Sequence, residues 1–431
     1  MGGHRVLFLG LQYPPHHTGG YELASADVAA RLARRGHTVT VLTSDLRLAG
    51  RHDHDGGGDG GVAVRRELRR YFRGDELHQP WFGSCWRIER ANQAALRRAL
   101  DASRPDVAVV WHMGALSLGL LTTIHEVGVP LLYVIADDWL CYGTTLDPWS
   151  RRFNGPRRSR LGRLARPFLR VPTTLPDLGR SGAFCFTSQD NRTRAERHSA
   201  WSYDRSTIAY LGVDTTVFAP IGPGRRQAGP WRGRLLYAGR YDRRKGIETA
   251  IRALAHLETA TLEVRGTGDV GERDRLAAVA DELGLAGRVE LAPPLPAAEL
   301  AARYRAADAV IFPSEWDEPF GLVPIEAMAC GTPVIATGVG GSGEFLADAG
   351  NCLRFRAGDP ASLAEAVRRL AADPSLRADL VAGGLRTASW FDVDHLADHV
   401  EAWIDALVEP SAHPDPPSRH SSASAIQPEG A

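Results

Sequence analysis

Short apolar segments alternate with longer helical patterns along most of this 431-residue chain. Strands that are apolar throughout and alternate with helices form parallel sheets with both faces covered. The first half therefore predicts a doubly wound α/β domain. Its expected strands cover residues 5–9, 38–43, 106–111, 131–135 and 183–187, and its expected helices cover 21–35, 87–102 and 116–127.

The second half repeats this rhythm after a segment rich in proline and glycine, 218–230, which we interpret as a linker. We expect two Rossmann-like domains, residues 1–215 and 216–390, that face each other across a cleft. Open parallel sheets bind ligands beyond the carboxyl ends of their strands. The second set of expected strands is 234–238, 261–265, 289–291, 309–312, 333–337 and 352–355, with helices at 246–257, 272–283, 297–306, 324–329 and 360–372.

Composition argues against several classes of protein. Lys+Arg and Asp+Glu are equal at 51 each, so no overall charge favours nucleic acid as a partner. The five cysteines show no metal-ligand spacing, and we expect neither a disulfide framework nor a metal site. No apolar run approaches the roughly 18 residues of a membrane span. The N-terminus carries no signal-like segment, which indicates a cytoplasmic location. The tail, 410–431, is rich in Pro, Ser and Ala and predicts disorder.

One stretch of the second half, residues 312–335, is the most informative. A strand ends there, and a helix follows in which Pro324 takes a favoured early position. The first turn of a helix leaves backbone N–H groups without partners, and these groups attract anions. We expect the amides of Phe320, Gly321 and Leu322 to form such an anion site.

Two carboxylates flank that site. Glu318 precedes the helix, and Glu326 lies on its second turn. A carboxylate can accept two hydrogen bonds from neighbouring hydroxyls. The pair therefore suits the hydroxyls of a sugar and of a ribose on either side of a diphosphate. In isolation, the same two residues also fit a charge that stabilises the helix dipole and an exposed helix glutamate.

A second constellation follows the first strand of the second half. Gly239 ends that strand, and the loop after it carries Arg240 and Lys245, the only lysine of the chain. Arginine binds phosphate as a bidentate fork and lysine as a point charge, so this loop suits a diphosphate. A solvated basic loop is the alternative, since Arg243 and Arg244 also lie there.

A third constellation follows the first strand of the chain. Gly19 and Gly20 open a helix, so that backbone amides can meet a charged group or a reacting centre. His16 and His17 precede them directly. A plain turn between a strand and a helix explains this segment equally well.

These motifs resemble those of the family-4 retaining glycosyltransferases, which have the GT-B fold. The resemblance covers residues 5–390 and is most specific in the second half. It rests on Gly19-Gly-x-Glu22, Arg35-Gly-His-x-Val39, Leu211-Gly-Val-Asp214 with Phe218, Gly239-Arg-x-x-x-x-Lys245-Gly246, Arg265-Gly-x-Gly268, Glu318-Pro-Phe-Gly-Leu-x-x-x-Glu326 and Ala329-Cys-Gly-Thr-Pro-Val334.

The resemblance implies that the second domain binds a nucleotide diphosphate sugar as a substrate. Because the cations of the loop and the helix start would stabilise the leaving diphosphate, we expect no metal ion and no cofactor. Glu326 would bind the ribose, and Glu318 would contact a hydroxyl of the donor sugar. Arg240 and Lys245 would hold the diphosphate together with the start of the helix. The family also implies a closing helix, 391–409, that packs back on the first domain.

The first domain departs from the family pattern. Many relatives carry His-Asp after the fourth strand, whereas Ala136 stands here at the position of that histidine. His112 after the third strand, or His16 and His17 in the Gly-Gly loop, are the candidates to replace it.

Three residues that follow the fourth strand are further acceptor-side candidates. Asp137, which we place among the catalytic residues, and Asp138 would orient the acceptor, unless they only cap a turn. The ring of Trp139 could stack on an acceptor, although aromatic residues at this spacing more often belong to a core.

Two further segments admit two interpretations each. Residues 266–271 fit the dinucleotide-binding pattern Gly-x-Gly-x-x-Gly, but we favour a loop that lines the base of the donor, with Gly266 as a contact. Residues 151–170 contain eight arginines and no acid. They predict a basic amphipathic segment that touches anionic lipid, or, as we favour, a solvated helix or a lid over the acceptor site.

As a whole, the sequence predicts a hexosyltransferase that moves a sugar, with retention, from a UDP- or GDP-linked donor to a small-molecule or envelope acceptor. Secondary metabolism is one setting that fits. A non-catalytic partner that binds nucleotide sugars and a nucleotide-sugar epimerase are the alternatives. A peripheral contact with the inner membrane face would run through 151–170. The sequence does not specify the oligomeric state.

Overall fold

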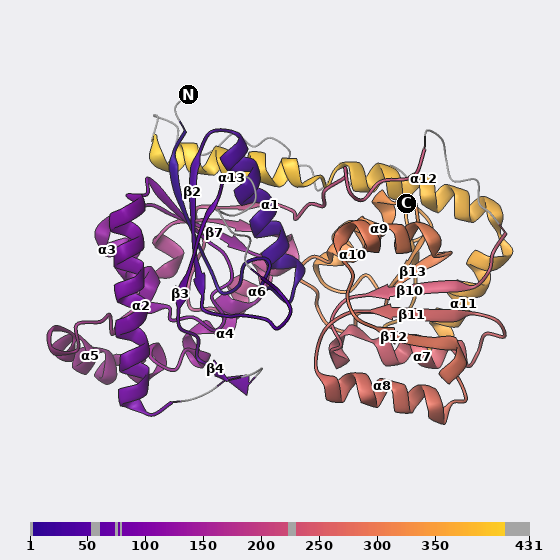
Figure 1. Ribbon diagram of the computed structural model, residues 1–431, viewed down its shortest axis with the longest axis horizontal. Coiled ribbons are helices and arrows are strands. Elements are labelled where there is room, and N and C mark those ends of the chain that lie inside the picture. The colour runs from indigo at the N-terminus through magenta and orange to yellow at the C-terminus, as the bar shows by residue number, and fades with distance from the viewer. Residues whose placement is uncertain (1–2, 53–60, 74–75, 78–79, 223–229, 410–431) are drawn as a thin grey trace. The chain divides into compact units, whose positions relative to one another are not determined.

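The computed structural model describes residues 3–52, 61–73, 76–77, 80–222 and 230–409 of the chain (Figure 1). These residues form two compact units. One unit runs to Ala209 and resumes at Leu396, and the other comprises Tyr210–His395. The middle of the predicted linker, 223–229, and the whole predicted tail lie outside the described residues.

The first unit contains a seven-stranded sheet in the order β3-β2-β1-β6-β7-β8-β9, in which all neighbours are parallel. The strand order reverses between β1 and β6, which is where open α/β sheets form a ligand crevice. The strands are β1 (Arg5–Gly10), β2 (Thr38–Ser44), β3 (Ala63–Leu68), β6 (Val107–Val110), β7 (Leu131–Ile135), β8 (Ala183–Phe186) and β9 (Ser206–Ile208), with a separate antiparallel pair, β4 (Phe72–Arg73) and β5 (Glu76–Leu77). The helices are α1 (Gly20–Arg34), α2 (Phe82–Ser103), α3 (Gly119–Val127), α4 (Trp139–Leu146), α5 (Pro156–Leu169) and α6 (Gln189–His198).

The sequence patterns predict neither β3 nor β9, so the expectation of five strands was incomplete. β3 reads Ala-Val-Arg-Arg-Glu-Leu and β9 covers three residues, and neither forms an apolar run. Both are edge strands, which have one neighbour only and tolerate charged side chains. Apolar patterning therefore identifies the five inner strands and misses the two edges.

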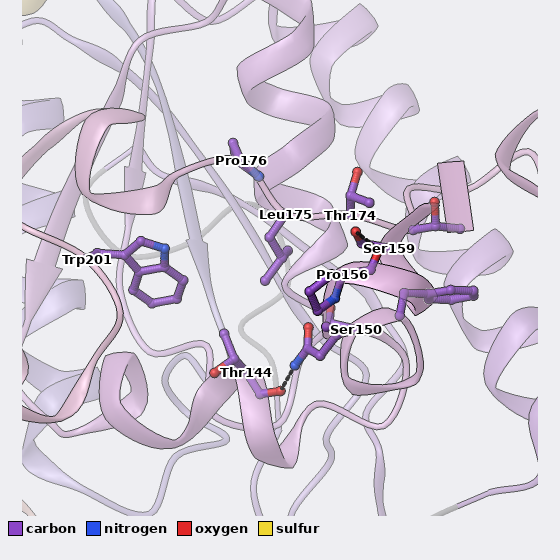
Figure 2. A pocket seen from close by; sticks show the side chains of 12 residues that line it. Thr144, Ser150, Pro156, Ser159, Thr174, Leu175, Pro176 and Trp201 are labelled. Atoms are coloured by element: carbon purple, nitrogen blue, oxygen red, sulfur yellow. Dashed lines mark hydrogen bonds between the residues drawn. The ribbon is translucent and has the colours of Figure 1, made fainter. Parts of the chain in front are cut away.

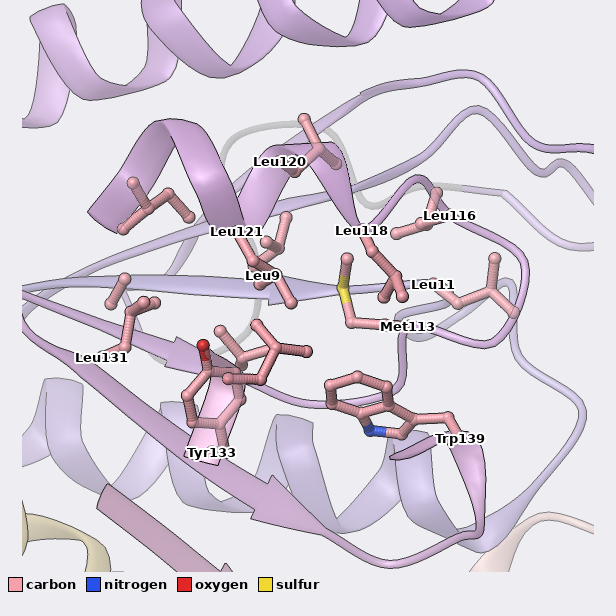
Figure 3. Close-up of a cluster of buried hydrophobic side chains, with 14 of the residues drawn as sticks. Leu9, Leu11, Met113, Leu116, Leu118, Leu120, Leu121, Leu131, Tyr133 and Trp139 are labelled. Atoms are coloured by element: carbon pink, nitrogen blue, oxygen red, sulfur yellow. The ribbon is translucent and has the colours of Figure 1, made fainter. Parts of the chain in front are cut away.

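The core of the first unit fixes the carboxyl ends of its central strands (Figure 3). Leu9 from β1, Met113 from the segment after β6 and Tyr133 from β7 meet Leu121 from α3 and Trp139 from α4. Each of these side chains is at most 1% exposed. Burial of apolar surface contributes about 25 cal/mol per Å². The polar residues that follow β1, β6 and β7 are therefore attached to a rigid frame.

The second unit contains a six-stranded parallel sheet in the order β12-β11-β10-β13-β14-β15. Here the strand order reverses between β10 and β13. The strands are β10 (Arg234–Ala238), β11 (Thr261–Arg265), β12 (Val289–Ala292), β13 (Ala309–Phe312), β14 (Val334–Ala336) and β15 (Leu353–Arg354). The helices are α7 (Ile247–Leu254), α8 (Val270–Glu282), α9 (Ala297–Ala306), α10 (Leu322–Ala329), α11 (Pro360–Ala372) and α12 (Pro374–Ser389).

The last helix, α13 (Val393–Val408), begins in the second unit and belongs to the first from Leu396 onward. Arg35 pairs with Glu401 at 2.5 Å and with Asp398 at 2.6 Å. The His37 ring lies 2.9 Å from the same Glu401 carboxylate. These contacts attach α13 to the end of α1 and the start of β2, and α13 coincides with the expected closing helix.

Candidate functional site

In the second unit, two loops carry most of the predicted donor residues. β10 and β13 are paired in the sheet and end at Ala238 and Phe312. The loops that follow them, 239–246 and 313–321, therefore leave the sheet at the point where the strand order reverses. Ligands bind at such a point in open α/β sheets. The topology thus brings together the two segments that the sequence motifs single out.

Lys245 and Glu318 are in direct contact, Nζ to Oε1. The Ser314 hydroxyl donates a hydrogen bond of 3.0 Å to the same carboxylate oxygen. Glu318 is 5% exposed, and its backbone is held by Gly340, where an added Cβ would lie 2.5 Å from the Glu318 nitrogen. The Lys245 ammonium also lies 5.5 Å from the centroid of the Trp316 ring. Two residues with separate predicted roles therefore hold each other in the structure.

The helix begins two residues before the start of the expected range, 324–329. α10 begins at Leu322, and Gly321 is its N-cap with a φ of 100°, a conformation that favours glycine. The ring of Phe320 is buried, 5.2 Å from the ring of Phe345. Phe320 thus precedes the helix and anchors it, while Val323 enters the first turn. Of the three residues expected to form an anion site, Gly321 and Leu322 therefore stand at the helix start, whereas Phe320 lies before it.

Glu326 lies on the second turn of α10, as predicted. Its Oε2 accepts a hydrogen bond of 2.7 Å from the Tyr304 hydroxyl. Burial raises the pKa of Glu326 to about 7, and the bond from Tyr304 acts in the opposite direction. A ligand whose hydroxyls bind the carboxylate would favour the ionised form. Glu326 is therefore near the midpoint of its titration at neutral pH.

The loops after β10 and β11 touch through their backbones. A Cβ at Gly266 would lie 1.8 Å from the carbonyl oxygen of Gly239, so only glycine fits there. Tyr241 donates its backbone N–H to Thr267 at 2.7 Å. The Arg240 carbonyl accepts a 3.0 Å hydrogen bond from Tyr237, and the Arg240 side chain is exposed. The structure thus places Gly239, Arg240 and Gly266 together at the carboxyl edge of the sheet.

In the first unit, His112 lies between two carboxylates. Its Nε2 is 3.2 Å from Asp137 Oδ2, and its Nδ1 is 3.6 Å from Glu22 Oε1. The Tyr142 hydroxyl donates a 2.9 Å hydrogen bond to the same oxygen of Asp137. Glu22 lies in α1, His112 follows β6 and Asp137 follows β7. The structure therefore joins three segments next to the reversal of strand order in the first sheet.

The histidine of this cluster is positively charged. Burial disfavours protonation of His112, but the charge of Asp137 and its hydrogen bond, together with Glu22, raise the pKa of His112 to about 10. Burial opposes ionisation of Glu22 as well, and the contact with His112 nevertheless lowers the pKa of Glu22. His112 therefore carries a proton at neutral pH and can donate a hydrogen bond.

Two glycines make room for the cluster. Gly19 is the N-cap of α1, which begins at Gly20, one residue before the expected range, and a Cβ at Gly19 would lie 3.0 Å from Glu22 Oε2. A Cβ at Gly114 would lie 2.4 Å from the Tyr142 hydroxyl and 2.6 Å from His112 Nε2. Any side chain at Gly114 would therefore displace one of these groups.

The other two candidate histidines have contacts elsewhere. His16 is 1% exposed, and its Nδ1 accepts a 3.0 Å hydrogen bond from the backbone N–H of Leu48. His17 Nδ1 lies 3.3 Å from the Arg51 guanidinium. Burial and then the charge of Arg51 lower the pKa of His17. Of the three histidines, only His112 meets Asp137, while His16 fixes a loop.

Of two further acceptor-side candidates, Asp138 has a contact within the first unit and Trp139 needs correction. Asp138 precedes α4 and lies 3.2 Å from the guanidinium of Arg194 in α6, so it joins two helices. Trp139 is 0% exposed and packs in the core, with its ring 6.3 Å from that of Tyr133. The prediction that the Trp139 ring could stack on an acceptor is wrong, because its apolar surface is already covered.

The prediction omitted two members of the cluster. Glu22 stands in the Gly-Gly motif but is not among the predicted site residues, and Tyr142 belongs to none of the motifs. Glu22 stands two residues after Gly20, at the first turn of a helix that opens at the ligand edge, and this placement was the available signal. Tyr142 follows Asp137 by five residues, a spacing with no regular helical or strand meaning.

Hollows elsewhere in the units contain none of these residues. One, of about 260 Å³, lies between the ends of α4 and α5 and is lined by Thr144, Ser159, Thr174 and Trp201 among others (Figure 2). Another, of about 230 Å³, lies in the second unit near Trp231 and Arg377. Among the described residues, these hollows are separate from the two polar clusters.

Comparison with known protein families gives an independent assignment. The profile described as Glycosyltransferase Family 4 matches residues 18–257, and the profile described as Glycosyl transferases group 1 matches residues 231–386. The chain belongs to glycosyltransferase family 4. The predicted family is therefore confirmed, and the two matches together run through both units.

Curated relatives of this family-4 chain are named D-inositol 3-phosphate glycosyltransferases. One from Acidothermus cellulolyticus is 39% identical over 222 residues, which cover 48% of this chain and 49% of the relative. One from Catenulispora acidiphila is 36% identical over 223 residues, which cover 48% and 53%. The chain thus spans about half the length of the curated relatives it matches.

Solved structures show the same fold at low sequence identity. Sucrose-phosphate synthase from Thermosynechococcus elongatus has a TM-score of 0.71 and 22% identity, covering 94% of this chain and 99% of that one. HepE from Anabaena, in complex with UDP and glucose, has a TM-score of 0.66 and 22% identity, covering 94% and 100%. The predicted fold class, two doubly wound α/β domains of the GT-B type, is confirmed.

Proposed function

We propose that this family-4 protein transfers a hexose-type sugar from a nucleotide diphosphate sugar to an acceptor hydroxyl, with retention of configuration. The observation that supports this most directly is the cluster of Lys245, Glu318 and Glu326 around the start of α10. The cation, the carboxylates and the helix start lie on the segments that follow β10 and β13. Between these two strands the order of the second sheet reverses. Each group matches one part of such a donor, as follows.

The diphosphate is the part that must leave. Arg240 and Lys245 supply two cations, and the N-terminus of α10 supplies backbone N–H groups. Cations and N–H groups that are in place before the reaction stabilise the charge that develops on the leaving group. Because these groups neutralise the diphosphate, the proposal needs no metal ion and no cofactor. Lys245 would leave Glu318 and turn to a phosphate oxygen when the donor binds.

The carboxylates would bind the hydroxyls of the donor. Glu318, released from Lys245, would accept a hydrogen bond from the sugar, and Glu326 would accept from the ribose. Glu318 is buried and Glu326 is half-buried, which makes these bonds stronger than they would be in water. We place UDP before GDP as the donor nucleotide, because the similarly folded HepE is in complex with UDP and glucose.

The first unit would supply the acceptor-side groups. Asp137 would orient the acceptor hydroxyl by accepting its hydrogen bond, and His112, which stays protonated, would donate to an oxygen of a substrate. His112 would thus take the role of the histidine that many relatives carry at the position of Ala136. A small-molecule or envelope hydroxyl is the acceptor class, and inositol phosphate is its first member to test, given the names of the curated relatives.

The test is incubation of the full chain with labelled UDP and GDP sugars and a panel of acceptors that includes inositol phosphates. We expect nucleotide release and a labelled product, unchanged by a chelator, whose anomeric proton coupling shows the configuration of the donor. Binding without turnover would instead indicate a nucleotide-sugar-binding partner. Interconversion of donor epimers without an acceptor would indicate an epimerase.

A further inference from the structure

Helix α5 exposes an unusual combination of side chains. Leu161 is 65% exposed, Leu164 is 72% exposed and Phe168 is 86% exposed. Their spacing of three and then four residues places them on one face of the helix. Three large apolar side chains in one line on the surface mark an interaction site more often than a solvated face.

The opposite face of α5 is fixed to the first unit. Gly162 is buried, and a Cβ there would lie 2.9 Å from the Phe153 ring and 3.2 Å from Thr173. Arg166 forms two hydrogen bonds, 2.6 and 2.5 Å, with Glu126 of α3. The Trp86 indole of α2 donates a 2.9 Å bond to the carbonyl of Leu169 at the end of the helix. α5 is therefore held in one orientation. Because its opposite face is fixed to the unit, its apolar line faces outward.

The charge around this line has one sign. α5 contains five arginines and no acid, and Arg170 follows it. The side chains of Arg157, Arg158, Arg160 and Arg163 are exposed. Within the part of the chain that the structure describes, no ion pair is recorded for these four. On a helical wheel, Arg157, Arg158 and Arg160 lie on or beside the apolar line.

We propose that α5 binds the protein peripherally to an anionic lipid bilayer. An amphipathic helix that lies in the interface buries its apolar side chains among the acyl chains and meets lipid phosphates with its basic side chains. A second copy of this chain that docked through its own α5 would bring the same positive charge to the contact and would be repelled. α5 has 14 residues, too few to span a bilayer. None of the helices in the described ranges is long and apolar enough to do so.

Vesicle flotation with the full chain tests this proposal. We expect binding to vesicles in which about a third of the lipid is phosphatidylglycerol, little binding to phosphatidylcholine alone, and partial release at about 1 M NaCl. Equal binding to both kinds of vesicle, or none to either, would overturn it. Loss of self-association in the apolar variant below, measured by sedimentation without vesicles, would reassign the face to a contact between copies.

Two sets of variants locate the surface. Leu161→Ser with Leu164→Ser and Phe168→Ser should lower the vesicle partition coefficient roughly tenfold or more, because the inserted apolar area is lost. The second variant replaces four arginines together: Arg157→Gln, Arg158→Gln, Arg160→Gln and Arg163→Gln. It should lower the vesicle partition coefficient by roughly fivefold for each arginine and should remove the salt dependence of binding.

Matched controls keep the result interpretable. Val127→Ser with Val270→Ser changes side chains that are 59% and 71% exposed on other helices. The charge control replaces four exposed arginines on other elements, Arg197, Arg205, Arg369 and Arg386. Circular dichroism and Tm should be unchanged throughout, since every site is on the surface. If the controls weaken vesicle binding as much as the α5 variants do, α5 is not the binding surface.

Discussion

The two units place polar clusters at equivalent points of their sheets but assemble them differently. In the second unit, the cluster comes from two short segments, 239–246 and 314–326, and each segment contains a recognisable motif. In the first unit, Glu22, His112 and Asp137 come from three distant segments, and each contributes one residue. A site built from contiguous motifs can be identified from the sequence, whereas a site built from single residues needs the fold.

The clusters also differ in how their charges are held. In the second unit, the long side chain of Lys245 pairs with Glu318 and can be withdrawn. In the first unit, His112 lies between two carboxylates on short side chains attached to rigid strands and a helix. We therefore expect the first cluster to contribute to stability as well as to function, and the second to contribute mainly to function.

The largest effect should come from Lys245→Ala. Loss of a group that stabilises the developing charge should lower kcat roughly a hundredfold or more. KM for the donor should change less, and Tm should fall less than in His112→Ala, since Ser314 still bonds to Glu318. Steady-state kinetics and thermal unfolding check both parts, and Lys245→Arg serves as the charge-preserving control. A large loss of Tm would erase the contrast with the first unit.

His112→Ala should reduce both activity and stability. We expect kcat to fall roughly tenfold to a hundredfold. Because Asp137 and the buried Glu22 would lose their charged partner, the free energy of unfolding should fall by about 3 kcal/mol. The contribution of His112 to stability is full below its ordinary pKa of 6.5 and is lost as the pH rises toward about 10. Denaturation of both proteins at pH 6 and pH 10 should show their difference shrinking.

Nucleotide affinity should depend on the ionisation of Glu326. Its pKa of about 7 in the free protein means that about nine tenths of the carboxyl is protonated at pH 6. Ribose hydroxyls bind the carboxylate, so the Kd for UDP should rise roughly tenfold between pH 8 and pH 6. Titration calorimetry should show proton release on binding near pH 6. Glu326→Gln should bind weakly at both pH values, and a parallel pH dependence in that variant would contradict the assignment.

The smallest effect concerns Glu89 in the core of the first unit. Glu89 accepts hydrogen bonds from Tyr71 and Ser117, and burial raises its pKa to about 8. The unfolded chain loses this proton near pH 4.5, so stability falls as the pH rises from there to about 8. The effect of Glu89→Gln on the free energy of unfolding should therefore be more favourable at pH 8 than at pH 5, by about 1 kcal/mol or more.

A comparison with Glu326 sharpens this last test. Both carboxyls have a raised pKa because of burial, but only Glu326 is expected to meet the donor. UDP should change the pH dependence of stability in the wild-type protein and in Glu89→Gln alike, and should have no such effect in Glu326→Gln. If UDP acts through Glu89 instead, the donor site has been placed in the wrong unit.

How far the sequence leads depends on the range of the interactions involved. Inner strands, the start of α1 at Gly20 and the second-turn position of Glu326 follow from local patterns. The edge strands β3 and β9 cannot be predicted from apolar patterns, because β3 is largely polar and β9 covers only three residues. The burial of Trp139 and the meeting of His112 with Asp137 depend on which strands are neighbours. That is a property of the whole sheet and not of any window of sequence.

The pairing of Lys245 with Glu318 has a practical consequence. Since Lys245 is the only lysine, reductive methylation with carbon-13 formaldehyde would give a single side-chain dimethylamine signal in addition to that of the chain terminus. The nearby Trp316 indole should shift this signal upfield through its ring current. A bound nucleotide sugar that draws the amine away from the indole would move the signal back. One resonance would therefore report donor binding to the second unit.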